Sequence, residues 1–126
     1  MTTSLVKHNR ELVLGALDAV KSGDIDGFMS VMHPDLSIHE PEHLPYGGIY
    51  KGGAGFLRLF AEAAKILDLS KIELVSATAD ESRTVLLMTV PLLSTGETVH
   101  ITEHWCVKHE WVTDVRVFWF EAPRFA

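Results

Sequence analysis

Two glutamates are candidate catalytic residues because each continues the apolar face of a predicted strand. In the segment VHITEHWCVK, residues 99–108, every second side chain from Val99 onward is apolar except Glu103. In DLSIHE, residues 35–40, Glu40 falls in the register of Leu36 and Ile38. Successive side chains of a strand point to opposite faces, so both carboxylates are expected to face the core.

Burial would give these carboxylates unusual chemistry. A buried carboxylate is unfavourable unless it is paired, hydrogen-bonded or neutral, and burial raises its pKa. A raised pKa suits a general base or a neutral hydrogen-bond donor at neutral pH. The alternation leaves two other interpretations open. Glu40 could turn to solvent at its strand end beside Pro41, and Glu103 could belong to a structural ion pair.

Other kinds of site have weaker support in the sequence. The chain has seven histidines but no H-E-x-x-H motif and no cluster of cysteine and histidine. His100 and His104 are four residues apart on one predicted strand, about 13 Å, which is too far to share a metal ion. Cys106 is on the same polar face, which we expect to meet solvent or a second subunit. The segment PYGGIYKGG, residues 45–53, lacks the Lys-Ser/Thr of a phosphate-binding loop, so its glycines are interpreted as turn residues.

Length and composition predict a single globular domain over residues 1–126. Apolar residues make up 47% and charged residues 22% of the sequence, which is usual for a folded domain. We find no apolar run of the ~18 residues that a membrane span needs and no secretory signal pattern. The single cysteine fits a reducing compartment, so a cytoplasmic protein is expected. The net charge of -6 argues against a nucleic-acid partner.

Periodicity places most helices before the strands. Helices are predicted at residues 5–21, 24–32 and 53–67, and Gly23 suits the left-handed position that ends the first of them. A short strand is predicted at residues 35–40, and further strands at 71–79, 83–93, 97–108 and 111–120, joined by short hairpin turns. This order indicates an α+β fold with helices on one face of a curved sheet, which can enclose a pocket.

The last predicted strand, residues 111–120, has an unusual outer face. Phe118 and Phe120 share that face with Asp114 and Arg116. Large exposed apolar groups are uncommon on monomers. We therefore predict a homodimer formed through the outer face of the sheet.

Several short motifs, taken in order, resemble one superfamily. They are Gly23-Asp24-x-Asp26-Gly27, the Glu40-Pro41 pair that ends a strand, the x-G-x-x-G start of the third helix, and VRVFWFE, residues 115–121. Over nearly its whole length the chain resembles the nuclear-transport-factor-2-like superfamily, in its SnoaL-like and ketosteroid-isomerase-like branch. The resemblance implies a cone-shaped, curved sheet, mixed or antiparallel, with three N-terminal helices packed on its concave face. It also implies a deep, mostly apolar pocket and a dimer.

The resemblance further implies roles for particular residues. As in ketosteroid isomerases, Glu40 would be the general base and Glu103 a protonated acid in the oxyanion hole. The first-helix tyrosine that supplies a second donor in those isomerases is matched here by Ala16, so Tyr46 or Tyr50 would have to supply it from the loop. The Asp-Arg-Asp set of the epoxide-hydrolase relatives is not matched, because Arg116 alternates outward. The residues expected to bind the substrate are Tyr46, Tyr50, Phe60, Met88, Val90, Leu92, Trp105, Val117 and Trp119.

These observations favour an enzyme that removes a proton next to a carbonyl in an apolar small molecule. Isomerases, polyketide cyclases and dehydratases begin with that step, and none of them requires a cofactor or metal for it. Two alternatives stay open: a non-catalytic module that binds a hydrophobic small molecule, and a dimeric accessory domain that acts through Phe118 and Phe120. Residues 42–50 are expected to cover the pocket mouth as a lid.

Overall fold

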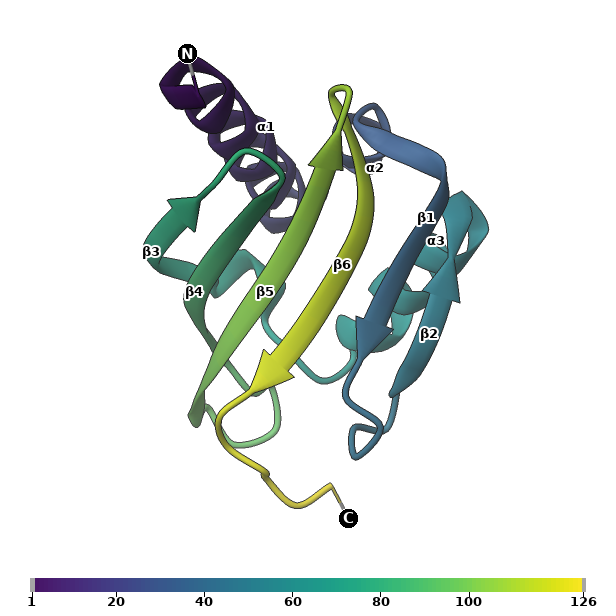
Figure 1. Cartoon of the computed structure of the whole chain (residues 1–126). Coiled ribbons are helices and arrows are strands. Elements are labelled where there is room, and N and C mark those ends of the chain that lie inside the picture. Colours follow the sequence, from purple (N-terminus) through teal and green to yellow (C-terminus); the bar gives the residue numbers. More distant parts are fainter. Residues whose placement is uncertain (1, 126) are drawn as a thin grey trace.

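The chain folds into one curved, unclosed sheet with helices packed against one face (Figure 1). The computed structural model describes residues 2–125, with side chains from residue 4 onward. The helices are α1 (Thr2–Ser22), α2 (Ile25–Met29) and α3 (Gly52–Ala63), with a 3-10 turn, η1 (Leu69–Lys71). The strands are β1 (Met32–Glu40), β2 (Gly48–Lys51), β3 (Glu73–Ala79), β4 (Arg83–Pro91), β5 (Thr98–Lys108) and β6 (Trp111–Trp119). The predicted α+β class with three helices is confirmed.

The sheet is mixed, and its order is β2-β1-β6-β5-β4-β3. Strands β1 and β6 pair in parallel, and the other neighbours are antiparallel. The segment from β3 to β6 is a meander of hairpins, as the short links between predicted strands indicated. Because β1 and β6 lie side by side at the centre, residues about 75 positions apart in the sequence share one face of the sheet.

The core lies between the sheet and the helices. Helix α1 buries the stripe of small and aliphatic residues that the helical period predicted, and α3 buries Phe56 and Leu59. Phe28 of α2 stacks on Phe56 with ring centroids 3.9 Å apart and meets Trp105 of β5 edge-on at 6.2 Å. Gly55 lets α3 approach the backbone of Tyr50 closely. The helices therefore seal the concave face with hydrocarbon.

Several elements differ from the sequence-based prediction. The sheet has one strand more than expected, because residues 48–51 form β2 and pair with β1. Strand β1 begins at Met32, so His33 and Pro34 lie inside a strand rather than ending a helix. The pairing of β1 with β6 shifts between Met32 and Ser37, and such an irregularity is where a strand tolerates proline. Helix α3 ends at Ala63 rather than at residue 67.

The loop between β1 and β2, residues 41–47, is folded tightly against the end of β1. The Leu44 amide donates to the Pro41 carbonyl (3.1 Å), and the Gly47 amide donates to the Leu44 carbonyl (3.0 Å). The Tyr50 hydroxyl donates to the Tyr46 carbonyl (2.6 Å), and the Leu44 and Tyr46 side chains are buried. This loop is therefore fixed by its own hydrogen bonds and packing.

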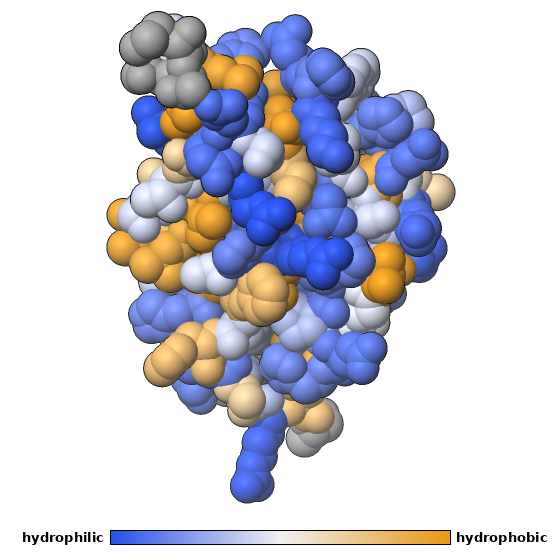
Figure 2. Space-filling view, in the orientation of Figure 1, coloured by the Kyte–Doolittle hydropathy of each residue, from blue (hydrophilic) through white to orange (hydrophobic). Residues whose placement is uncertain are grey.

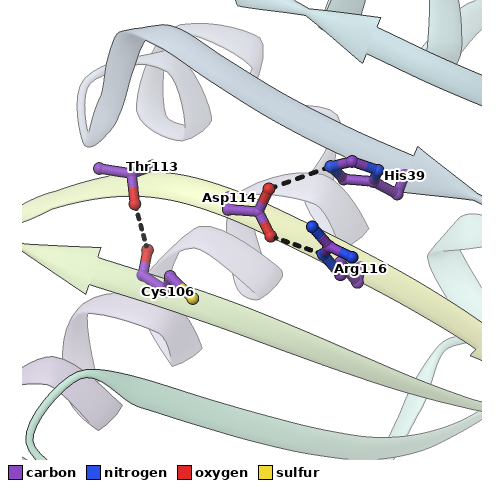
Figure 3. A network of polar contacts seen from close by, with 5 residues as sticks. All are labelled: His39, Cys106, Thr113, Asp114 and Arg116. Carbon is purple, nitrogen blue, oxygen red and sulfur yellow. Dashed lines mark hydrogen bonds and ion pairs between the residues drawn. The ribbon is translucent and has the colours of Figure 1, made fainter.

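The outer face of the sheet, away from the helices, is mixed in character. Figure 2 shows hydrophilic groups interspersed with apolar ones on this face. Asp114 of β6 lies 3.1 Å from His39 Nε2 of β1 and accepts a hydrogen bond from Arg116 Nε at 3.2 Å (Figure 3). On the same face the side chains of Phe118 and Phe120 are 52% and 87% exposed. None of the described helices is long and apolar enough to cross a membrane.

The first prediction concerns the fixed β1–β2 loop. A Cβ at Gly47 would collide with the Pro41 carbonyl oxygen and the Glu42 backbone, so Gly47→Ala is expected to destabilise the protein by about 1–3 kcal/mol. The matched control is Gly15→Ala in α1, where a Cβ meets open space and should stabilise the helix by about 0.5–1 kcal/mol. Urea unfolding measures both. Equal effects of the two substitutions would contradict the described loop geometry.

Candidate functional site

The two glutamates lie in one cross-strand row on the concave face of the sheet. Glu103 of β5 is paired opposite Val117 of β6, and Ile38 of β1 is paired opposite Val115 of β6. Because β1 and β6 run in parallel, Glu40, two residues after Ile38, lies level with Val117, two residues after Val115. The carboxylates therefore flank Val117, with backbones about 10 Å apart, and both side chains face the helices. On either side the row continues to Gly48 of β2 and Leu86 of β4.

The glutamates line a cavity of about 100 Å³ between the sheet and the helices. Of the residues around it, those with a side-chain nitrogen or oxygen are Glu40, Tyr46, Glu103, Trp105 and Trp119. The remaining lining residues are aliphatic, phenylalanine or, at position 88, methionine. An engineered apolar cavity of about 150 Å³ holds benzene, so this space suits a ligand no larger than a single ring. A steroid-sized ligand is larger than this space.

Glu103 has a hydrogen-bond partner inside the cavity. The Trp105 indole Nε1–H donates to Glu103 Oε1 at 3.1 Å. Burial raises the pKa of Glu103 from 4.5 to about 7, and the Trp105 hydrogen bond limits the rise. Glu103 can therefore change its protonation state close to neutral pH.

Glu40 has no such partner. Its Oε1 is buried and makes no hydrogen bond to any described residue. Burial raises the pKa of Glu40 well above 4.5, and the charge of Glu103 raises it further. The side chain as a whole is half-buried because it borders the cavity. Two carboxylates that repel each other in an apolar cavity do not both ionise readily, so the pair holds one proton over a range of pH.

Tyr46 is the hydroxyl-bearing residue of the cavity wall. It comes from the β1–β2 loop and is 5% exposed. Burial raises the pKa of Tyr46, and the charges of Glu40 and then Glu103 add to the rise. Its phenol therefore stays neutral and can donate a hydrogen bond. Helix α1 contributes Leu17 and Val20 to the wall and no donor.

Trp119 supplies a second free donor. Its Nε1 is buried without a partner among the described residues. The indole is held edge-on between His43 of the β1–β2 loop and Phe125, with centroids 6.4 and 6.2 Å away. A ligand with a hydrogen-bond acceptor at this end of the cavity would satisfy the Nε1–H group.

The structure places most of the predicted binding residues around the cavity. Those that line it are Tyr46, Phe60, Met88, Val90, Trp105, Val117 and Trp119. Tyr50 and Leu92 are buried but are not among the lining residues. Tyr50 instead anchors the loop through its hydroxyl and carries the Arg58 guanidinium 4.9 Å above its ring. Leu92 follows the end of β4 and bridges to Leu67.

Apart from Phe60, sequence reasoning missed the helical wall of the cavity. This wall consists of Leu17, Val20, Phe28, Phe56, Leu59 and Ala63, together with Leu67, Leu69 and Ile72 after α3. The apolar stripe of α1 was visible in the sequence, but periodicity does not distinguish core residues from cavity residues. Among the described residues, no three histidine, cysteine, aspartate or glutamate side chains are grouped to hold a metal ion.

Comparison with known proteins identifies the family. The model of the SnoaL-like domain matches residues 13–119. The chain belongs to the SnoaL-like family. The match covers both glutamates, the β1–β2 loop and every strand of the sheet. No curated protein sequence matches this SnoaL-like chain closely enough to count as a relative.

Solved structures agree on the fold. An NTF2-like protein from Burkholderia xenovorans is 21% identical, with a TM-score of 0.77 over 93% of this chain and 92% of that one. A candidate ketosteroid isomerase from Kribbella flavida is 18% identical, with a TM-score of 0.79 over 96% and 84%. A candidate polyketide cyclase from Sinorhizobium meliloti is 18% identical, with a TM-score of 0.72 over 86% and 94%. At these identities the likeness shows the fold of this SnoaL-like domain.

The raised pKa of Glu103 predicts how stability depends on pH. Its pKa is about 7 in the folded state against an ordinary 4.5. The folded state therefore holds more protons than the unfolded state between these values, and the free energy of unfolding falls as the pH rises through them. A pKa shift of this size changes the free energy of unfolding by on the order of 3 kcal/mol.

Urea unfolding at about pH 5 and about pH 8 checks this dependence. Glu103→Gln removes this ionisable group and is expected to reduce the difference, whereas the part due to Glu40, whose pKa burial also raises, should remain. Glu42→Gln, which changes an exposed glutamate, is the control and should leave it intact. A wild-type protein that is equally stable at both pH values would contradict the raised pKa.

Proposed function

We propose that this protein catalyses proton transfer at a carbon next to a carbonyl group in a small, mostly apolar substrate. The observation that carries the proposal is the placement of two mutually repelling carboxylates in one apolar cavity, Glu40 and Glu103. Such a pair supplies both an ionised base and a neutral acid at one pH. The SnoaL-like family, whose structural neighbours include candidate isomerases and cyclases, supports the same chemistry.

The proposed step uses one carboxylate as base and the other as donor. The ionised carboxylate takes the proton from the carbon, and the electron pair of that C–H bond forms a C=C bond. The carbonyl oxygen becomes an enolate oxygen, which accepts hydrogen bonds from the neutral carboxyl group and from Tyr46. Donors aimed at developing charge in a dry cavity strongly favour such a transition state. Return of the proton to the same or another carbon completes exchange or isomerisation, and the step requires no cofactor.

The apolar wall determines what the substrate can be. Around the carboxylates the cavity presents hydrocarbon and aromatic rings, and its polar contacts are few. Such walls bind an apolar body and leave orientation to one or two polar groups. The cavity volume of about 100 Å³ favours a single-ring or smaller carbonyl compound over a polycyclic one. The competing proposal, a binding module, predicts ligand binding that does not depend on either carboxylate.

The experiment that tests the function is hydrogen–deuterium exchange into a small cyclic ketone, such as cyclopentanone, followed by NMR. The wild type is expected to accelerate exchange, and the double variant Glu40→Gln/Glu103→Gln should lose at least about 100-fold of that acceleration. The control Glu42→Gln should keep it. Equal exchange by wild type and the double variant would contradict the proposal. Equal ligand-induced thermal shifts in both would then favour the binding module.

We also propose that two copies of the chain associate through the outer face of the sheet. Phe118 and Phe120 are exposed beside the charged network of His39, Asp114 and Arg116. Burying such rings against a second copy removes apolar surface from water. The face is self-complementary in charge, because it carries both an acidic and several basic groups.

Substitution of one ring tests the dimer. Phe118→Asp is expected to convert a dimer into a monomer in sedimentation or light scattering, since it places an unpaired charge in the interface. Leu57→Asp, at a similarly exposed leucine on α3, is the control and should leave the dimer intact. A wild-type chain that is already monomeric would contradict this interface.

A further inference from the structure

The hydrogen bonds of the two carboxylates are not equivalent, and this difference bears on which of them is charged. Glu103 Oε1 accepts the Trp105 Nε1–H at 3.1 Å, whereas Glu40 Oε1 is buried with no partner among the described residues. An indole nitrogen can only donate. A donor held against a carboxylate favours its ionised form, and a bare oxygen in an apolar wall favours the neutral form.

The other titratable group of the cavity lies on the Glu40 side. Tyr46 follows Glu40 by six residues, in the loop that leaves the end of β1, and the charge of Glu40 affects it more than that of Glu103. The described residues that α1, α2 and α3 contribute to the wall are all apolar. The cavity therefore has one side with a carboxyl group that lacks a described partner and a phenol, Glu40 and Tyr46, and another side on which Glu103 accepts a hydrogen bond from Trp105.

We propose that Glu103 is the base of this site and that Glu40, together with Tyr46, donates hydrogen bonds to the substrate oxygen. These roles are the reverse of those that the resemblance to ketosteroid isomerases implies. The inference rests on the proposed function and assigns its two carboxylates. The substrate lies across Val117, with its acidic C–H toward Glu103 and its carbonyl oxygen toward Glu40 and Tyr46.

This arrangement conserves protons over the reaction cycle. Glu103 enters the step as a carboxylate, takes the proton from carbon, and becomes a neutral acid. Glu40 and Tyr46 keep their protons and share them with the enolate oxygen in hydrogen bonds. When Glu103 returns the proton to carbon, the starting charges are restored. Trp105 is a positioning residue, because it acts on the substrate only through Glu103.

Single glutamine variants distinguish the two carboxylates. Glutamine resembles a protonated glutamate, since its amide can donate but cannot remove a proton. Glu103→Gln is therefore expected to lose exchange into cyclopentanone by about 1,000-fold. Glu40→Gln should stay within about tenfold of wild type, and Glu40→Ala, which removes the donor, should lose about 100-fold. Loss in Glu40→Gln with retention in Glu103→Gln would overturn the assignment, and so would equal losses in both.

The pH dependence of the rate in a Trp105 variant provides a second test. If Trp105 had only a structural role, its substitution would not shift the pH–rate profile. Trp105→Phe removes the N–H group that favours the Glu103 carboxylate, so the rising limb of the pH–rate profile should move to higher pH. Trp111→Phe, at an exposed tryptophan on β6, is the control and should leave the limb in place. An unchanged limb in Trp105→Phe would contradict the proposal.

Carboxyl-carbon NMR titration tests the charge assignment without turnover. In the wild type, Glu103 is expected to ionise at lower pH than Glu40, with each signal identified by its loss in the corresponding glutamine variant. Glu40 ionising first would overturn the inference even if exchange is fast. Glu103 ionising first in a protein that exchanges no ketone would instead reject the proposed reaction and keep the charge assignment.

Discussion

The burial of two carboxylates on either side of Val117, together with the repulsion between them, is the constraint on which the chemistry of this cavity depends. Both side chains face apolar walls, so the charge of one is felt by the other with little screening by water. The pair therefore holds a single proton where two exposed glutamates would hold none. Small differences in surroundings then decide where that proton resides. The Trp105 N–H group at Glu103 and the absence of a described partner at Glu40 Oε1 are such differences.

The sheet, the helices and the β1–β2 loop each contribute a different part of the cavity. The sheet fixes the spacing, because β1 and β6 pair in parallel and bring Glu40 level with the Glu103–Val117 pair. The helices contribute only apolar side chains to the cavity wall. The β1–β2 loop provides a phenol donor, Tyr46, and the position of the loop is held by the Tyr50 hydroxyl. Helix α1 places no hydrogen-bond donor in the cavity wall, and the Tyr46 hydroxyl of the loop supplies one instead. The sequence of α1 alone does not show this.

The inward orientation of the glutamates was predictable because a strand has a side-chain period of two. Once Leu36 and Ile38 are inside, Glu40 follows them, and Glu103 follows Val99 and Ile101. Strand β2 was not predictable, because its four residues lie among glycines and pair only when β1 is in place. The irregularity around Pro34 and the helical wall of the cavity depend on tertiary contacts. The same holds for Tyr50, whose sequence position does not show that it anchors the loop.

The energetic cost of the site supports the proposed function. A buried polar atom without a partner costs about 1–3 kcal/mol, and replacing a buried charged pair with apolar residues is often neutral or stabilising. Glu40 Oε1 and Trp119 Nε1 both face that cost in a cavity otherwise lined by hydrocarbon. Valine or leucine at these positions would make a more stable wall. An unpaired acid and an unpaired donor have no role in holding a purely apolar ligand, and this supports the proposed proton transfer over a module of that kind.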